Sequence, residues 1–266
     1  MFEAFYGMTH TPFTRNVPPE ALYRSTALNE IVSRLAYAAE RQWFAVVTGD
    51  CGTGKSTAIR RLQAQLDRTQ YQVLYLADSK LMPRYFYKGL LEQLGCEAKY
   101  FRGDAKRQLH REVDILRGVH QLRPVAIVDE AHLLDRDMME EVRFLLNQNM
   151  DSASPLALIL VGQSELWDRL ERQAYAAIRQ RIDVQCQVPY YDRAEVGAYI
   201  QAHLTYAGTE QPIFSDQALD AIYRYSSGAA RLINKVCTHS LLYGAQNGHR
   251  VIDEPIVTRV VQGELT

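Results

Sequence analysis

The fold is decided by one stretch, residues 43–57, which read Trp43-Phe-Ala-Val-Val-Thr-Gly-Asp-Cys-Gly-Thr-Gly-Lys-Ser-Thr57. The apolar residues 44–48 predict a buried strand, and residues 49–56 match the pattern GxxxxGK[ST]. Gly49, Gly52 and Gly54 allow the backbone to curl, so that its N–H groups converge on phosphate oxygens. A helix that begins near Gly54 points its positive end at the same place. An isolated match of this kind can arise by chance, but the flanking strand and helix favour a true phosphate-binding loop.

The residue types in this loop predict how a nucleotide and its metal are held. Lys55 reaches the β- and γ-phosphates, the hydroxyl of Ser56 coordinates Mg²⁺, and Thr57 faces the α-phosphate. The expected ligands are therefore ATP and Mg²⁺. The other residues expected to contact the nucleotide form the rest of the loop: Gly49, Asp50, Cys51, Gly52, Thr53 and Gly54.

A second apolar stretch ends in two adjacent acids, and reads Val125-Ala-Ile-Val-Asp129-Glu130. A buried strand with this ending directs both carboxylates toward a phosphate loop on a neighbouring strand. Asp129 is expected to hold Mg²⁺ through water, and Glu130 to orient and polarise the attacking water. Two solvated acids that cap the next helix would explain the pair alone, but not the pair together with a phosphate loop.

His132 completes the string Asp-Glu-Ala-His, which also occurs in a helicase motif. The other helicase signatures are missing from the sequence. We therefore interpret His132 as a residue that supports the site without contacting the nucleotide, or as an ordinary loop residue.

Strands and helices alternate through the first part of the chain. Near-continuous apolar strands that alternate with helices predict an α/β fold with a parallel five-stranded sheet flanked by helices. The expected strands are 44–48, 72–77, 125–129, 156–161 and 183–188. The expected helices are 54–67, 82–94, 105–121, 137–149 and 165–171.

The pattern changes after Pro189, which marks the predicted domain boundary. Helices are expected at 193–206, after a Ser215 N-cap, along the apolar stripe through Leu232, Val236 and Cys237, and near 254–262. The predicted domains are a nucleotide-binding α/β domain at 1–189, whose segment 1–25 lies near the adenine, and a helical lid domain at 190–266.

Composition excludes several classes of protein. Four cysteines without CxxC spacing argue against a disulfide or zinc framework, and no apolar run approaches the length of a membrane span. The N-terminus has no signal-peptide pattern, so a cytoplasmic protein without a membrane partner is expected. The net charge of −1 means that any contact with nucleic acid requires a local basic patch.

These motifs resemble those of AAA+ P-loop ATPases, and more narrowly the ExeA/GspA-like and TniB/TnsC-like group, which includes secretion-assembly ATPases and ATP-dependent regulators of DNA transposition. The resemblance covers nearly the whole chain. Beyond the two phosphate motifs, it rests on an aromatic opening from Phe5-Tyr6-Gly7 to Leu22-Tyr23 and on three strings: Gly162-Gln-Ser-Glu-Leu166, Ile178-Arg-Gln-Arg-Ile182 and Gly228-Ala-Ala-Arg-Leu-Ile-Asn234.

The resemblance implies further site residues. Gln163 corresponds to the polar sensor 1 residue that contacts the γ-phosphate or the lytic water, although Asn, Ser or Thr is commoner there and a loop Gln that caps the next helix is the alternative. Arg181 or Arg179 corresponds to the arginine that one subunit inserts into the ATP site of its neighbour, unless both lie on a solvated basic face. Arg231 resembles sensor 2 of the lid. Tyr23 is expected near the adenine, or in the core.

The resemblance leaves three functions open. The first is an ATP-hydrolysing regulator of DNA transposition that forms a ring or helical filament on double-stranded DNA and recruits or activates a transposase, with a target-selection protein as a further partner. The second is an ATPase of a secretion or envelope-assembly system. The third is a nucleotide-gated switch with little hydrolysis. By family analogy, secretion-type relatives carry a membrane span and a wall-binding region beyond the ATPase, whereas these 266 residues contain no apolar 20-mer, so the first function is expected. An intact Glu130 argues against the third.

Contacts to DNA are expected from Lys80, Arg84 and Lys88, whose four-residue spacing places three cations on one helical face. Tyr85 and Tyr87 are interleaved with them. A solvated helix face explains the spacing equally well. A second, weaker candidate is the basic cluster Lys99, Arg102, Lys106, Arg107 and Arg111.

Overall fold

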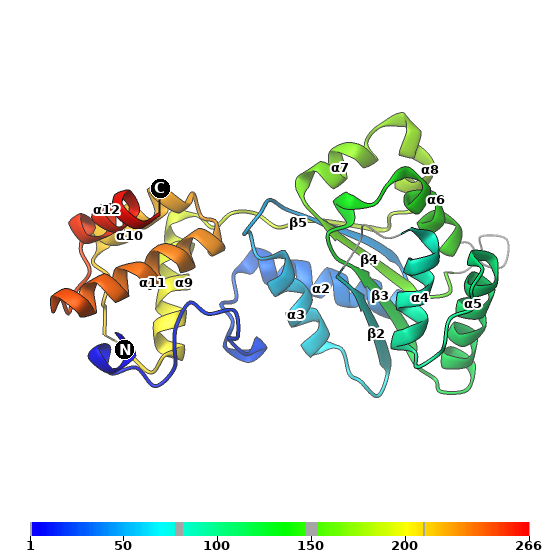
Figure 1. Cartoon of the computed structure of the whole chain (residues 1–266), viewed down its shortest axis with the longest axis horizontal. Coiled ribbons are helices and arrows are strands. Elements are labelled where there is room, and N and C mark those ends of the chain that lie inside the picture. Colours follow the sequence, from blue (N-terminus) through cyan, green and yellow to red (C-terminus); the bar gives the residue numbers. More distant parts are fainter. Residues whose placement is uncertain (1, 78–81, 147–153, 210, 266) are drawn as a thin grey trace. The chain divides into compact units, whose positions relative to one another are not determined.

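The computed structural model describes residues 2–77, 82–146, 154–209 and 211–265. The chain divides into two compact units, each described here by itself (Figure 1). The sheet unit comprises residues 29–50 and 58–188. The helical unit comprises residues 1–28, 51–57 and 189–266.

The sheet unit is built on five parallel strands in the order β2-β3-β4-β1-β5. The central strands are buried along their whole length, which explains their continuous apolar sequence. Their bounds are Phe44–Thr48 (β1), Tyr71–Leu76 (β2), Arg123–Val128 (β3), Ala157–Gly162 (β4) and Val184–Gln187 (β5). All five expected strands are confirmed: β1 has the expected ends, and the ends of the other four shift by one or two residues.

Helices flank this sheet. Alternate strand residues such as Val46, Ala126 and Leu158 share one buried cluster with apolar residues of α4, α5 and α6. The helical elements are α2 (Thr26–Arg41), α3 (Lys55–Gln65), α4 (Pro83–Gln93), α5 (Arg102–Gly118), η2 (Ala131–Leu133), α6 (Arg136–Leu145), α7 (Ser164–Leu170), η3 (Gln173–Tyr175) and α8 (Ala176–Arg179).

The helix α2 is absent from the elements expected above. Its apolar residues Leu28, Ile31 and Leu35 recur at helical spacing and are buried. The Ser25 hydroxyl accepts the Leu28 N–H at 3.2 Å, as an N-terminal cap does. The sequence therefore contained the signal for this helix.

The helical unit contains α1 (Phe2–Tyr6), η1 (Pro19–Ala21), α9 (Arg193–Tyr206), α10 (Asp216–Ser226), α11 (Ala230–Asn247) and α12 (Glu254–Glu264). The Ser215 cap is confirmed, because its hydroxyl accepts the Ala218 N–H. Among the residues described, no helix has both the length and the apolar character that crossing a bilayer requires.

The N-terminal segment packs into the helical unit. Phe2, Tyr6 and Phe13 are buried in the same cluster as Ile200 and Ile233. The predicted domain boundary lies at 189/190, with residues 1–25 in the α/β domain, whereas in the structure residues 1–28 group with the C-terminal helices. Burial of these aromatic side chains accounts for the difference.

Candidate nucleotide-binding site

The phosphate-loop motif lies between β1 and α3, as expected. β1 is fully buried, and α3 begins at Lys55. Gly52 and Gly54 have φ angles of +85° and +105°, which side chains rarely tolerate. Thr53 is buried. The loop therefore has the curled, glycine-dependent backbone that phosphate binding requires, and Ser56 and Thr57 follow in the first turn of α3.

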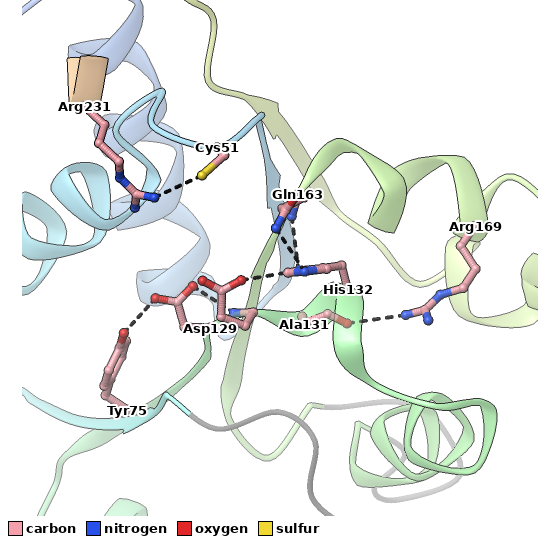
Figure 2. Close-up of polar contacts among 9 residues, drawn as sticks. Cys51, Tyr75, Asp129, Ala131, His132, Gln163, Arg169 and Arg231 are labelled. Atoms are coloured by element: carbon pink, nitrogen blue, oxygen red, sulfur yellow. Dashed lines mark hydrogen bonds and ion pairs between the residues drawn. The ribbon is translucent and has the colours of Figure 1, made fainter. Parts of the chain in front are cut away.

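Arg231 contacts this loop, although it lies far away in sequence. Its backbone N–H donates to the Gly52 carbonyl at 3.3 Å, and its Nη1 donates to the Cys51 Sγ at 3.0 Å (Figure 2). A Cβ on Gly52 would lie 3.0 Å from the Arg231 Cβ. The start of α11 therefore packs directly on the phosphate loop, and glycine is needed at position 52 to allow the close approach.

The two acids follow β3 at the carboxyl edge of the sheet, the edge at which β1 enters the loop. Asp129 is 7% exposed, and its Oδ1 accepts the Glu130 N–H at 2.8 Å. Glu130 has a left-handed backbone, with φ 51° and ψ 32°, and its side chain is half exposed. One carboxylate is therefore buried and oriented, and the carboxylate next to it in sequence is accessible.

Tyr75, at the end of β2, is a site residue that the sequence analysis missed. Its hydroxyl donates to Asp129 Oδ2 at 2.7 Å (Figure 2). Burial raises the pKa of Tyr75, and its hydrogen bond to Asp129 raises that pKa further, so the phenol stays a donor at neutral pH. Tyr75 could have been identified from its position near the end of β2, but only with the knowledge that β2 pairs with β3.

Gln163 lies directly after β4 and contacts His132. The Gln163 Nε2 is 3.2 Å from His132 Nε2, and the Gln163 backbone N–H donates to His132 Nδ1 at 3.5 Å (Figure 2). The next residue, Ser164, donates from its hydroxyl to Asp50 of the loop at 2.5 Å. Gln163 therefore contacts the Asp-Glu-Ala-His turn, and its neighbour Ser164 contacts the start of the phosphate loop.

The two candidate arginines occupy different surroundings. Arg179 Nη1 donates to the carbonyls of Leu170 and Glu171 at the end of α7. Arg181 lines a cavity of about 860 Å³ together with Arg41, Arg117 and Arg123. This cavity also includes Phe44 and Asp183, which lie at the amino ends of β1 and β5. Arg181 is therefore at the edge of the sheet opposite to the phosphate loop.

The remaining candidates are placed as follows. Tyr23 packs edge-on against Tyr191 and Tyr199 in the helical unit and is partly buried. Lys80 lies outside the described residues. Lys88 pairs with Glu92 at 3.5 Å, and the Arg84 guanidinium carbon lies 3.8 Å from the centre of the Tyr100 ring.

Tyr87, which is interleaved with Arg84 and Lys88 in the sequence, is not accessible to DNA. Its side chain is fully buried, and its hydroxyl donates to the buried Glu141. Lys106 and Arg102 of the second basic cluster also pair with Glu141, at 3.2 and 3.3 Å. The buried Glu141 carboxylate is stabilised by these two cations. Lys106 and Arg102 are therefore less available to bind an external anion such as DNA phosphate.

The donors present fit a nucleotide with a divalent cation. The positive-φ glycines form a backbone cradle, the start of α3 contributes its dipole, and Ser56 and Asp129 offer the oxygen ligands that Mg²⁺ prefers. Tyr75 already occupies one side of the Asp129 carboxylate and so fixes its orientation.

Comparison with known proteins identifies the family of this chain. Residues 38–170, half of the chain, match the family described as AAA domain. The chain is 31% identical over 261 residues to general secretion pathway protein A of Aeromonas hydrophila, which covers 95% of this chain and 46% of that protein. The chain therefore spans less than half the length of this relative.

Solved structures share the fold. Cdc6p from Pyrobaculum aerophilum has a TM-score of 0.67 at 17% identity, covering 90% of this chain and 67% of that one. The structure of Drosophila ORC bound to DNA has a TM-score of 0.67 at 20% identity, and the match covers 96% of this chain and 64% of that one. The RuvB Holliday junction branch migration motor of Thermotoga maritima has a TM-score of 0.59 at 15% identity, and the match covers 88% of this chain and 66% of that one. The family match and the phosphate-binding architecture lead to one conclusion: the chain belongs to the AAA domain family and is an AAA+ P-loop ATPase that binds and hydrolyses ATP.

Proposed function

We propose that this ATPase is a regulator of DNA transposition, which assembles with ATP on double-stranded DNA and recruits or activates a transposase. The single observation that carries the DNA part of this proposal is an exposed arginine–aromatic surface on the sheet unit, described below. The assembly part is supported by the position of Arg181.

Within one subunit, the loop and the acids divide the chemistry of hydrolysis. Mg²⁺, when bound, neutralises charge that develops on the phosphates. Lys55 holds the β- and γ-phosphates, while Ser56 and Asp129 hold the metal. Glu130 orients the attacking water from the half-exposed position of its carboxylate. Arg231 reaches the phosphates from the helical unit, a role that its contacts with Cys51 and Gly52 support. Tyr23 remains our candidate for contact with the adenine.

Hydrolysis also requires a second subunit in this proposal. Arg181 lies at the amino edge of the sheet, while the phosphate loop follows the carboxyl end of β1. An arginine at the opposite edge serves the nucleotide of a neighbour, where its guanidinium neutralises charge on the γ-phosphate. Arg179 is less suited to this role, since its guanidinium is bonded to carbonyls of α7. The expected assembly is a ring or helical filament.

DNA is proposed to contact a surface that we call the Tyr100 surface. It carries exposed large side chains and a stacked guanidinium, and consists of Met82, Arg84, Tyr85, Tyr100 and Phe101. Tyr100 and Phe101 are 68% and 69% exposed, which is unusual for adjacent aromatic residues. On duplex DNA, arginine and tyrosine side chains contact the phosphates and sugars of the backbone, and this surface offers both residue types.

Two structures with a similar fold support a DNA partner. RuvB is described as a Holliday junction motor, the Drosophila ORC structure contains DNA, and both share this fold. Such similarity concerns architecture, so it adds weight only together with the Tyr100 surface.

A second candidate function is an ATPase in a secretion or envelope-assembly system. It is favoured by the 31% identity to general secretion pathway protein A, which extends over nearly the whole of this chain. In that case the Tyr100 surface binds a protein instead of DNA. The third reading, a nucleotide-gated switch with little hydrolysis, is disfavoured by the intact Glu130.

Assembly on DNA is the test. With ATP and duplex DNA, we expect electron microscopy of the Glu130→Gln variant to show stable rings or filaments around the duplex, because this variant binds ATP and hydrolyses it about 10²–10⁴-fold more slowly. Lys55→Ala should show neither nucleotide binding nor assembly. Assemblies that form with ATP alone and ignore DNA would favour the secretion reading.

The DNA surface has its own matched comparison. Replacing Arg84, Tyr100 and Phe101 with Ala should weaken duplex binding at least about tenfold and flatten its salt dependence. Replacing Lys235 and Val251, an exposed cation and an exposed apolar residue of the helical unit, should leave both unchanged. Equal binding by the two variants would remove the Tyr100 surface from the proposal.

A further inference from the structure

We propose that His132 is a positioning residue for hydrolysis, whose imidazole joins the amide of Gln163 to the carboxylate of Glu130. The direction of the Glu130 carboxylate then depends on what the Gln163 amide contacts. This inference rests on the proposed roles of Glu130 and Gln163 in the ATPase reaction.

The first observation is that His132 lies between the two groups and is shielded from water. Its side chain is 9% exposed. On one side its Nδ1 is 3.5 Å from Glu130 Oε2, and on the other its Nε2 is 3.2 Å from Gln163 Nε2 (Figure 2). A buried imidazole takes its hydrogen-bond partners from the protein, and here these partners are the expected base and the expected sensor.

The second observation is that one ring nitrogen, Nδ1, has two competing partners. Nδ1 faces both Glu130 Oε2 and the backbone N–H of Gln163, each at 3.5 Å. A neutral imidazole protonated on Nδ1 donates to Glu130 and accepts from the Gln163 amide through Nε2. The other tautomer accepts the Gln163 backbone N–H at Nδ1 and has no hydrogen to give Glu130.

The amide of Gln163 therefore selects the tautomer. While its NH₂ group donates to Nε2, the ring hydrogen stays on Nδ1 and holds the Glu130 carboxylate. The carboxylate then keeps one direction, from which it can orient the attacking water. When the amide no longer donates to Nε2, the ring hydrogen can move to Nε2 and Glu130 loses this contact, so the base orients water less well.

The third observation is that the surrounding backbone is fixed, so that the coupling runs through side chains. The Arg169 Nη2 donates to the Ala131 carbonyl at 3.3 Å, which ties α7 to the turn of His132. A Cβ on Gly162 would lie 3.0 Å from the His132 backbone nitrogen. β4 and η2 are thus in direct backbone contact, with no room for an intervening side chain.

The experiment measures ATP turnover and, separately, binding of a fluorescent ATP analogue for His132→Ala and His132→Asn in the full-length chain. We expect kcat to fall by about 10- to 100-fold in His132→Ala, with nucleotide affinity within about twofold of the unmodified protein. Asn places an amide near the position of Nδ1, so it restores the donor to Glu130 and recovers part of the rate. His120→Asn, an exposed histidine after α5, is the matched control and should change neither quantity.

A double-mutant cycle with Gln163→Ala distinguishes positioning from packing. If His132 acts through Gln163, the double variant is no slower than the slower single variant, because both changes break the same connection. Additive losses, a loss of nucleotide affinity that matches the loss of rate, or normal turnover in His132→Ala would each overturn the inference. Glu130→Gln is measured alongside: normal turnover there would overturn the proposed base itself and the inference with it, while a slow Glu130→Gln beside a normal His132→Ala overturns the inference alone.

Discussion

At the scale of single residues, Gly228 shows how a position without a side chain controls a functional group. Its φ is +81°, and a Cβ there would lie 1.9 Å from the Tyr191 carbonyl oxygen. The Tyr191 N–H donates to the Gly228 carbonyl at 3.1 Å. Gly228 therefore fixes the backbone three residues before Arg231, whose contacts with the phosphate loop depend on where α11 begins.

Gly228→Ala should destabilise the helical unit far more than Gly248→Ala. Both glycines have positive φ, which costs alanine about 1–2 kcal/mol, but Gly248 has open space around it. The overlap with Tyr191 adds about 1–3 kcal/mol at Gly228. Hydrogen exchange of α9 and α11 measures the difference, and equal protection in the two variants would show that the backbone contact has no such effect.

At the scale of elements, the N-terminal segment is fixed to α9 by a buried histidine. His203 is 5% exposed, and its Nδ1 accepts the Phe13 N–H at 3.0 Å. The two rings stack with centroids 5.0 Å apart. Burial lowers the pKa of His203 to about 4, so the ring stays neutral and can accept the hydrogen bond.

This histidine predicts a pH dependence with a definite sign. The folded pKa is about 4 and the ordinary value 6.5, so the unfolded chain binds more protons between these values. The stabilisation is complete above pH 6.5 and is lost as pH falls through about 4, a total of roughly 3 kcal/mol. His203→Asn keeps an acceptor near Nδ1 but does not titrate. Acid unfolding followed by circular dichroism should therefore be less steep between pH 6.5 and 4 in the variant, and unchanged steepness would contradict the assignment.

The elements themselves were largely predictable from sequence. Fully buried parallel strands have continuous apolar sequences, so β1 was predicted to the residue and the other four to within two. The helix α2 was missed despite its apolar spacing, because no motif drew attention to it. The phosphate loop was recognisable because its glycines and the Lys55-Ser56 pair follow one another at a fixed spacing within eight residues, so no long-range contact is needed to identify it.

Contacts between distant segments were not predictable in this way. Tyr75 meets Asp129 only because β2 pairs with β3, and His132 meets Gln163 only because β3 pairs with β4. In the sequence, Tyr87 is interleaved with the expected DNA contacts Arg84 and Lys88. Its burial beside Glu141 depends on how α4, α5 and α6 pack, which periodicity within one helix does not encode.

At the scale of the whole molecule, the proposed division of one active site between two subunits has a direct test. Arg181→Ala and Glu130→Gln should each hydrolyse ATP poorly. Mixed together, they should regain part of the activity, because an Arg181→Ala subunit keeps its own Glu130 and receives an intact arginine from a Glu130→Gln neighbour. ATP turnover across a range of mixing ratios measures this effect. If the turnover of every mixture is only the weighted average of the two low rates, Arg181 acts within its own subunit or not at all.

The separation of Arg181 and the phosphate loop on opposite sheet edges has a consequence for how activity scales with size. In an open chain of n subunits only n − 1 junctions are complete, so one terminal copy always lacks a partner and turnover per subunit grows with length. A closed ring has no terminal copy, so all of its junctions are complete. Its turnover per subunit therefore rises to the full value in one step when the last subunit closes the ring. Turnover plotted against assembly size would therefore distinguish a growing filament from a ring without an image of either.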